Sequence, residues 1–371
     1  MMYWKTGLLV ALAICQVQAE ELITPTYVEN VDQSLQRIVS GWEAQPGQHP
    51  HHVSLRQVNA NGGVSACGGS LVHSEWVISA AHCTALQVTL VIRAGVVALS
   101  TPPYIYETTE WYNHPTFNDQ NPMLVQPNDI ALIKLQKPVT FSNRIQPIRV
   151  QSNTEAFRDY DTEIVQASGH GRLWTDGNSP EVLNWVYLRA VSNSRCHQLF
   201  GSTVINDNSI CAGPYNVTSQ STCQGDSGGP LVHISSDGVP VLVGVASFVA
   251  GGAHGCHSGI PAGFVRPGPF LGWFEEVSGI DFDNIDEEEV TTWAPEETEP
   301  PTTTPEPEVS TEAPDSEEEE SDEDSSESDE GDPELSQLLK KLQVQVKVNV
   351  KLNKYGIKHE HNHNKTITHH K

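Results

Sequence analysis

Short runs of apolar and β-branched residues recur between Ile38 and about Phe264, and clusters of Gly, Pro and Asn separate them. Runs of this length predict β-strands, and the turn residues between them favour an all-β barrel or sandwich. The strands predicted in this way are Val53–Leu55, Trp76–Ser79, Val88–Ile92, Ile130–Leu135, Val186–Leu188 and Val241–Val245. One helix is predicted at Phe270–Val277, between Pro269 and Gly279.

Beyond Ile280 the pattern changes twice. Thr, Pro and Glu dominate residues 290–314, and Asp, Glu and Ser dominate residues 315–334. Such a stretch cannot bury enough apolar surface to fold, so we expect 281–334 to be a largely disordered linker. Leu342–Leu352 then alternates apolar and polar residues, which is the period of a strand with one apolar face. This segment could dock on a sheet edge, self-associate or remain unstructured.

The charge of the chain is concentrated in the same region. The 371 residues include 47 acidic and 21 basic side chains, a formal charge of −26, and 25 of the acids lie in 281–334 without any Lys or Arg. A chain this acidic lacks the basic face that nucleic acid requires, so no nucleic-acid partner is expected. Residues 335–371 are basic and end in a His-rich segment. This tail could bind matrix, mineral or cations such as Zn or Cu, or act only as a solvated spacer.

The amino terminus has the pattern of a secretory signal peptide. Lys5 precedes the apolar run Leu8–Val17, and the small residue Ala19 follows it. The run is too short to span a bilayer, and no later stretch is as apolar, so we expect a secreted protein without a membrane anchor. Removal of residues 1–19 also removes Cys15 and leaves six cysteines, an even number suited to disulfides in an oxidising compartment.

Three short motifs indicate the chemistry. Ala80–Cys83 contains a histidine after a predicted strand, Asn128–Leu132 contains an aspartate before another, and Gln224–Leu231 is a glycine-rich turn around a serine. Each motif alone is usually structural. Together and in this order they resemble the trypsin/chymotrypsin-type serine proteases, over roughly Ile38–Ile280. The resemblance implies two antiparallel six-stranded β-barrels with a C-terminal helix, and an active site in the cleft between the barrels.

The resemblance also implies the catalytic roles. A serine hydroxyl is a poor nucleophile at neutral pH and needs an adjacent base that a third group orients. Ser227 would be the nucleophile, His82 the general base and acid, and Asp129 the group that orients His82. The backbone N–H groups of Gly225 and Ser227 would form the oxyanion hole. Substrates would be proteins or peptides, without a cofactor or metal, and no calcium site is expected around residues 93–109.

Two further features follow from the family pattern. The implied disulfides are Cys67–Cys83, Cys196–Cys211 and Cys223–Cys256. Arg37 and Ile38 resemble a zymogen cleavage site, which makes residues 20–37 an activation propeptide. The freed Ile38 amine would pair with Asp226, because a buried carboxylate without a partner is costly.

The substrate pocket can also be assigned by resemblance. Ser221 stands where trypsins carry Asp at the pocket floor, and a neutral floor cannot compensate the burial of a basic side chain. The other pocket residues would be Thr222, Ser247, Phe248, Val249 and Ala262. Val249 would narrow the entrance, and this region resembles arthropod chymotrypsin-like and brachyurin-type proteases. We therefore expect cleavage after apolar residues, chymotryptic to elastolytic, and a separate trypsin-like protease as the activator. His170 departs from the family, which commonly has Trp there.

The predicted organisation is thus a signal peptide (1–19), a propeptide (20–37), a peptidase domain (38–280), a linker (281–334) and a basic, His-rich tail (335–371). Asn216 and Asn364 begin N-glycosylation sequons. The main functional hypothesis is a secreted serine endopeptidase. The alternative is a matrix- or mineral-associated binding protein that acts through its tail, with proteolysis secondary.

Overall fold

The computed structural model describes residues 22–27, 41–172, 179–223, 225–251, 254–256 and 258–285. All of them belong to one unit, Met1–Glu299, and the second unit, Pro300–Lys371, contains none of them. The predicted signal peptide, the Arg37–Ile38 cleavage site, most of the linker and the whole basic tail with Asn364 therefore lie outside the described residues.

The first sheet is built from the amino-terminal half of the domain. Among the described residues it has seven strands in the order β7-β6-β3-β4-β5-β9-β8, every pair antiparallel. Their bounds are β3 His52–Asn59, β4 Val64–His73, β5 Trp76–Ser79, β6 Gln87–Ala94, β7 Tyr104–Thr108, β8 Trp111–Asn113 and β9 Ala131–Lys134. In β6 the alternate residues Leu90, Ile92 and Ala94 are buried, which is the period-two pattern of a strand with one face on a core.

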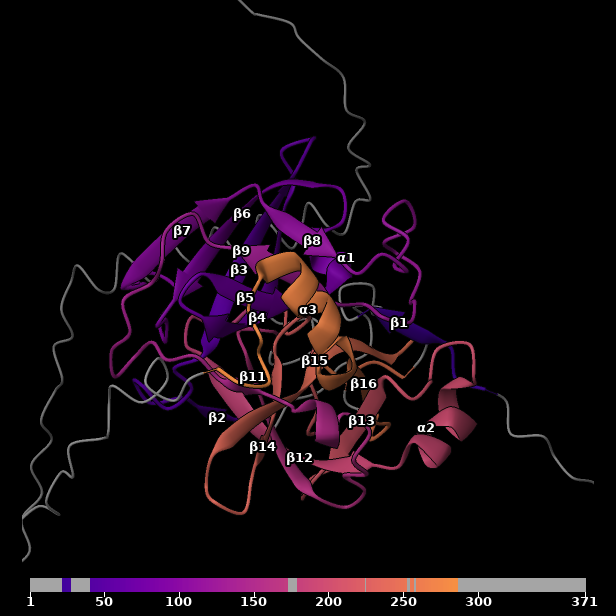
Figure 1. The fold of residues 1–371 in the computed structure, drawn as a ribbon. Helices are drawn as coiled ribbons and strands as arrows, with labels where there is room; N and C mark the ends of the chain where they lie inside the picture. Colours follow the sequence, from indigo (N-terminus) through magenta and orange to yellow (C-terminus); the bar gives the residue numbers. More distant parts are fainter. Residues whose placement is uncertain are drawn as a thin grey trace, which may run out of the picture. The chain divides into compact units, whose positions relative to one another are not determined.

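The second sheet has nine strands, again counted among the described residues (Figure 1). Six of them form a ring, β15-β14-β11-β12-β13-β16, that closes through pairing of β16 with β15. Strand β10 joins β15 in parallel, β2 joins β12, and β1 joins β15. The bounds are β1 Pro25–Tyr27, β2 Trp42–Glu43, β10 Arg149–Val150, β11 Ile164–Gly169, β12 Asn184–Val191, β13 Ser209–Pro214, β14 Pro230–Ile234, β15 Pro240–Ala250 and β16 Ala262–Val265.

The predicted fold class is confirmed, with one correction. The second barrel has the six strands that were expected. In the first sheet, the edge strands β7 and β8 do not pair with each other in the described part of the chain, so this half has seven strands and stays open. A sheet can curve around its own core without closing. Side chains, and not backbone hydrogen bonds, then lie between its two edge strands.

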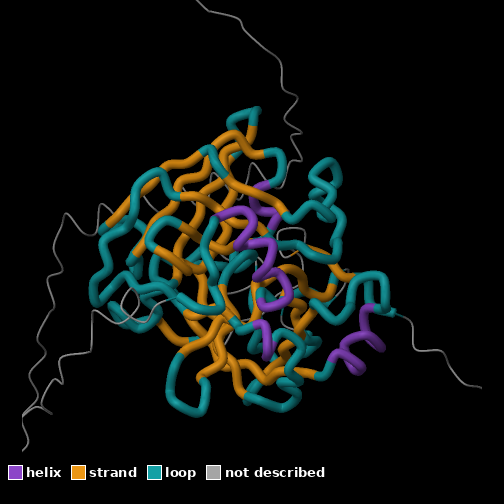
Figure 2. The backbone as a smooth tube through the Cα atoms, viewed as in Figure 1, coloured by secondary structure: helices purple, strands orange, loops and turns teal. Residues whose placement is uncertain are grey.

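Helices are few in the described part of the chain (Figure 2). They are α1 Ala81–Thr84, α2 Asn193–Phe200 and α3 Leu271–Ser278, with short 3-10 turns η2 Asn153–Glu155 and η3 Gly268–Phe270. Helix α3 confirms the predicted C-terminal helix and ends at Gly279, whose φ of 76° is left-handed. No helix among the described residues is long and apolar enough to cross a membrane.

One hydrophobic core joins the two sheets. It contains Leu71 and Ile78 from the first sheet, Leu242 from β15, and Phe274 from α3, all fully buried or nearly so. The packing continues past the predicted domain boundary at Ile280, because the buried Phe282 ring lies 6.0 Å from that of Phe274. The folded domain therefore extends at least to this aromatic pair.

Candidate active site

His82 is fixed by the element that carries it. Strand β5 ends at Ser79, and the single turn α1 places His82 immediately beyond it. The next residue, Cys83, forms a disulfide with Cys67 of β4, with a Cα–Cα distance of 6.3 Å. A covalent link on one side of the turn and a buried strand on the other leave the imidazole little freedom to move.

Asp129 orients the His82 imidazole through a hydrogen bond to its Nδ1 atom. Its fully buried carboxylate accepts three hydrogen bonds: the backbone N–H of His82 donates to Oδ1 at 2.8 Å, and His82 Nδ1 and Ser247 Oγ each donate to Oδ2 at 2.6 Å. The preceding Asn128 has a left-handed φ of 57°, which Asn tolerates. The Asn128 side chain is bonded to Asn208 at 2.9 Å, so the turn before Asp129 is anchored to the second barrel.

Ser227 lies in the turn that leads into β14. Gly225 and Gly228 on either side have φ of 97° and 75°, and a Cβ on Gly228 would lie 2.2 Å from Ser79 Oγ. The turn therefore packs directly against the end of β5, and Gly68 N–H donates to Ser227 O at 2.7 Å. These contacts bring Ser227 to the same place in the fold as His82.

The hydroxyl of Ser227 and the backbone N–H groups beside it are the predicted nucleophile and oxyanion hole. The Oγ of Ser227 is buried and has no hydrogen-bond partner among the described residues. Within that same part of the chain, no acceptor is assigned to the backbone N–H groups of Gly225 and Ser227. Backbone N–H groups that have no acceptor among the described residues can bind an oxyanion.

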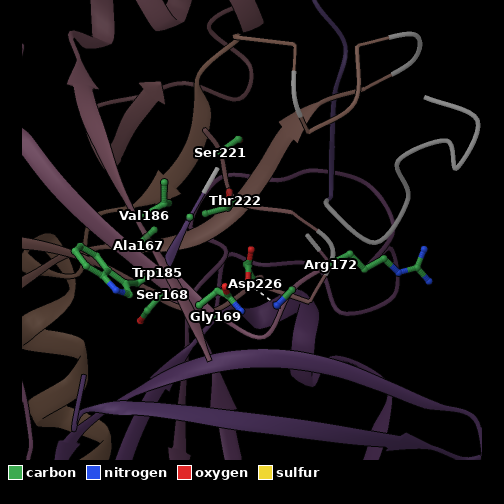
Figure 3. Close-up of a pocket in the computed structure, with 12 residues that line it drawn as sticks. Ala167, Ser168, Gly169, Arg172, Trp185, Val186, Ser221, Thr222 and Asp226 are labelled. Carbon is green, nitrogen blue, oxygen red and sulfur yellow. Dashed lines mark hydrogen bonds between the residues drawn. The ribbon is translucent and has the colours of Figure 1, made fainter. Parts of the chain in front are cut away.

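The Asp226 carboxylate lies in a cradle formed by Gly169–Gly171, against the backbone of its two glycines (Figure 3). Its Oδ1 accepts from Gly171 N–H and its Oδ2 from Cys223 N–H, both at 2.8 Å. A Cβ on Gly171 would lie 2.4 Å from the Asp226 carboxyl carbon, so glycine is required here. A pocket opens beside the carboxylate, and its lining includes Gly41 and Ser221.

Four buried histidines form two ring contacts, one of them with the cradle residue His170: His49 with His51, and His52 with His170. The ring of His170 is 5.7 Å from that of His52, and its Nε2–H donates to Val97 O at 3.2 Å. Burial lowers the pKa of His170 to about 4, and it lowers that of His52 well below the usual range. These rings are therefore neutral at pH 7. His170 fills the position of the usual Trp as a buried neutral ring.

The predicted pocket residues come from two walls. Ser221 and Thr222 precede the nucleophile turn, and both are buried. Val249 and Ala262 pack in one cluster with the Cys223–Cys256 disulfide. The other two wall residues are also buried: Phe248 packs its ring against Phe200 at 5.3 Å, and Ser247 is the residue bonded to Asp129.

The comparisons agree with this geometry. Residues 38–273 match the family model described as Trypsin. The chain belongs to the trypsin family of serine proteases. It is 32% identical to a protein named Collagenase from Hypoderma lineatum, over 66% of this chain and 89% of that protein. It is 33% identical to Trypsin 5G1 from Aedes aegypti, over 68% of this chain and 88% of that protein.

A solved structure supports the same conclusion. The structure of HL collagenase superposes with a TM-score of 0.58 at 32% identity, and covers 66% of this chain and 99% of that one. The protein is thus a serine endopeptidase of the chymotrypsin fold. The disulfides of the protease are Cys67–Cys83, Cys196–Cys211 and Cys223–Cys256, which are the pairs that the family resemblance implied.

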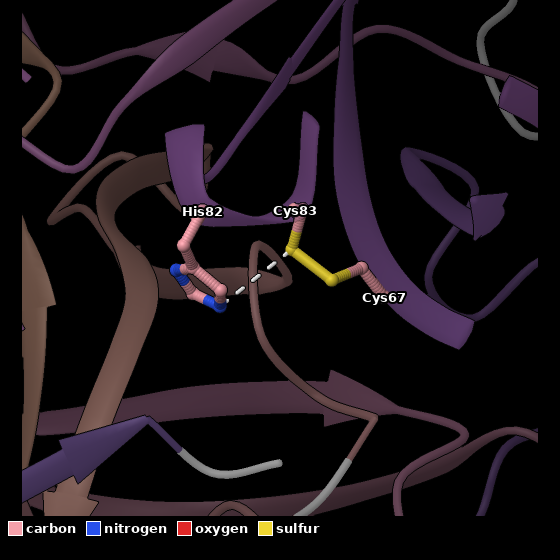
Figure 4. A group of neighbouring side chains, drawn as sticks. All are labelled: Cys67, His82 and Cys83. Carbon is pink, nitrogen blue, oxygen red and sulfur yellow. Dashed lines mark hydrogen bonds between the residues drawn. A yellow bond between two sulfur atoms is a disulfide. The ribbon is translucent and has the colours of Figure 1, made fainter. Parts of the chain in front are cut away.

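One cluster of potential metal ligands in the protease has another explanation. Cys67, His82 and Cys83 lie close together, with Cys83 Sγ 3.8 Å from His82 Nε2 (Figure 4). Cysteine binds a metal as a thiolate, and both sulfurs are already joined in a disulfide, which leaves His82 as the one possible ligand of the three. The cluster is the covalent brace of the histidine turn.

Sequence reasoning missed two parts of the site. The first is the hydrogen bond from Ser247 to Asp129, because Ser247 was expected only as a pocket wall. The second is β1, a strand inside the predicted propeptide. It pairs with β15 of the protease, and Tyr27 stacks on His82 with ring centroids 4.0 Å apart. A single Tyr in a short polar segment gives no sequence signal for such a contact.

Proposed function

We propose that the protein is a secreted digestive-type endopeptidase that cleaves peptide bonds through an acyl-enzyme. His82 takes the proton from Ser227 Oγ as that oxygen attacks the substrate carbonyl carbon, and then gives it to the leaving amine. Asp129 keeps the proton-bearing Nδ1 of His82 oriented and stabilises the imidazolium. This chemistry follows the family's general mechanism. The observation that carries the proposal is the buried carboxylate of Asp129, fixed by three donors that include His82 Nδ1.

The charge that develops on the substrate oxygen needs its own stabilisation. We infer that the backbone N–H groups of Gly225 and Ser227 donate to this oxyanion. The glycine conformation at Gly225 and the absence of assigned acceptors for these groups in the described turn support this role. Donors that already point at the developing charge need no reorganisation during reaction, and losing one such donor typically lowers kcat by about 10²–10³.

We infer that the enzyme is made as a zymogen. Cleavage after Arg37 would free the amine of Ile38, and this new terminus would enter the pocket beside Asp226. The pocket lining and the two glycines that make room for the carboxylate support this assignment. Full activity of an Arg37→Gln chain, which trypsin cannot cleave at that bond, would refute it. A Lys at position 37 is the matched control, because trypsin accepts either basic residue.

We further infer a preference for apolar residues before the cleaved bond, in the range from chymotryptic to elastolytic. Ser221 is neutral, so no carboxylate at the floor would offset the burial of an Arg or Lys charge. Val249 and Ala262 are buried in one apolar cluster, and Val249 would narrow the pocket entrance. A panel of otherwise identical peptides ending in Ala, Leu, Phe or Arg tests this after activation with trypsin, which is then inhibited and removed. The apolar residues Ala, Leu and Phe should all give a higher kcat/KM than Arg, and a preference for Arg would overturn the assignment.

A further inference from the structure

The segment Leu22–Tyr27 adds a strand to the wall of the substrate cleft. Pro25 pairs with Ala250, Thr26 with Val249 and Tyr27 with Phe248, all antiparallel. Two of these partners, Phe248 and Val249, belong to the predicted pocket wall. A peptide that binds by strand addition gains main-chain hydrogen bonds from the exposed edge and specificity from alternate side-chain pockets.

Tyr27 makes the central contact. Its side chain is 1% exposed, and its ring stacks on the His82 imidazole at 4.0 Å with an interplanar angle of 21°. It belongs to the same hydrophobic cluster as Phe248 and Phe200. The His82 side chain is only 5% exposed, and Ser227 is fully buried. A substrate could not reach the catalytic pair without displacing Tyr27.

Further contacts anchor the start of the segment. Ile23 N–H donates to Leu199 O at 2.7 Å, and Gly251 N–H donates to Thr24 O at 2.9 Å. A Cβ on Gly251 would lie 2.9 Å from that same Thr24 oxygen, so glycine permits the close approach. Thr24 and Pro25 also line a groove with Leu124. The segment is therefore held by backbone bonds at several points along its length, in addition to the ring of Tyr27.

We propose that Leu22–Tyr27 is a substrate-like peptide ligand of this enzyme's own cleft. Tyr27 occupies a subsite between His82 and Phe248 that binds an aromatic side chain. Before cleavage at Arg37 the segment blocks the cleft from within the chain, and after cleavage it competes with substrates as a separate peptide. The proposal rests on the proposed function, because it requires His82 to be catalytic and Arg37 to be the cleaved residue.

The test uses the full chain activated by trypsin, and the peptide Leu-Ile-Thr-Pro-Thr-Tyr, which corresponds to residues 22–27. We expect competitive inhibition: the peptide raises KM for a chromogenic substrate and leaves kcat unchanged. The matched control peptide carries Tyr27→Ala and should inhibit at least about tenfold less well, since each factor of ten corresponds to about 1.4 kcal/mol of binding free energy. No inhibition at about 1 mM peptide, the range of a weak ligand, would overturn the proposal, as would inhibition that lowers kcat alone.

A second arm separates this inference from the proposed function. A fluorescent form of the same peptide is titrated into the trypsin-treated Ser227→Ala chain, and its anisotropy reports binding without any catalysis. Binding that depends on Tyr27 supports the proposal whether or not the wild-type chain hydrolyses peptides. If the activated wild-type chain is inactive, the proposed function fails. If that chain is active but the peptide does not inhibit it, or if the binding of the peptide does not depend on Tyr27, only the present inference fails.

Discussion

The four buried histidines predict that the folded domain loses stability in mild acid. In the folded state burial lowers the pKa of His49 and His170 to about 4 and that of His51 to about 3, and it lowers the pKa of His52 well below its usual range. An unfolded histidine titrates near 6.5. The unfolded chain therefore binds more protons than the folded one below this pH. The free energy of unfolding must fall as pH falls from about 6.5 toward about 4.

The size of the effect follows from the same values. A histidine with a folded pKa of about 4 contributes about 2 kcal/mol less to stability at about pH 5 than at about pH 7.5, and His51 contributes a similar loss. Domains of this kind are stable by only about 5–15 kcal/mol. A loss of several kcal/mol from one cluster is therefore large enough to measure.

The assay is urea unfolding of the full chain at the two pH values, followed by tryptophan fluorescence. A Ser227→Ala background prevents self-digestion. His170→Gln keeps a donor for Val97 O but removes one titrating ring, so it should reduce the stability loss between the two pH values by about 2 kcal/mol. His197→Gln on α2, at an exposed position, is the matched control and should leave the loss unchanged. An unchanged loss in His170→Gln as well would show that the buried ring does not control the pH dependence.

Three further predictions concern the active site and the domain boundary. Ser247→Ala removes one of the three hydrogen bonds to the Asp129 carboxylate and should lower kcat by about tenfold with little change in KM. Steady-state kinetics on the activated enzyme measures both constants, and equal effects on kcat and KM would contradict the positioning role of Ser247. Gly171→Ala places a Cβ against the Asp226 carboxyl and should lower peptidase activity by more than about tenfold, even after complete cleavage at Arg37. Normal activity of that fully cleaved variant would show that Asp226 does not need the space that Gly171 leaves. A chain that ends after Ile285 keeps the Phe274–Phe282 contact and should retain full peptidase activity, whereas any matrix retention should be lost with the tail; a loss of activity would make the tail part of the enzyme.

The sequence was a good guide wherever a residue's role depends on its neighbours in the chain. The strands Trp76–Ser79 and Val241–Val245 were predictable because local apolar runs decide them, and both lie in observed strands. The motifs around His82, Asp129 and Ser227 were predictable because each needs a particular turn. The open edge of the first sheet was not, because strand pairing depends on distant segments.

The two largest surprises have the same cause. Pro25–Tyr27 has no period-two pattern, and its strand exists only because β15 offers an edge for it to pair with. The partners Pro25 and Ala250 lie 225 positions apart in the chain. The buried histidines were likewise invisible, since histidine occurs as often on surfaces as in cores. In both cases the contacting residues are remote in sequence, as Pro25 is from Ala250 and His52 from His170, so neither local pattern nor composition predicts the contact.

The strand β1 has a consequence for where the enzyme can work. While it is covalently attached, a short peptide meets its cleft at an effective concentration in the millimolar range, so even a weak ligand keeps the site occupied. Cleavage after Arg37, the activation step proposed above, would end that advantage, and occupancy would then depend on the concentration of the enzyme itself. Activated protease packed densely in a secretory compartment would stay partly occupied by its own peptide, and dilution on release would empty the cleft. Dilution would then be a second step of activation, after proteolysis.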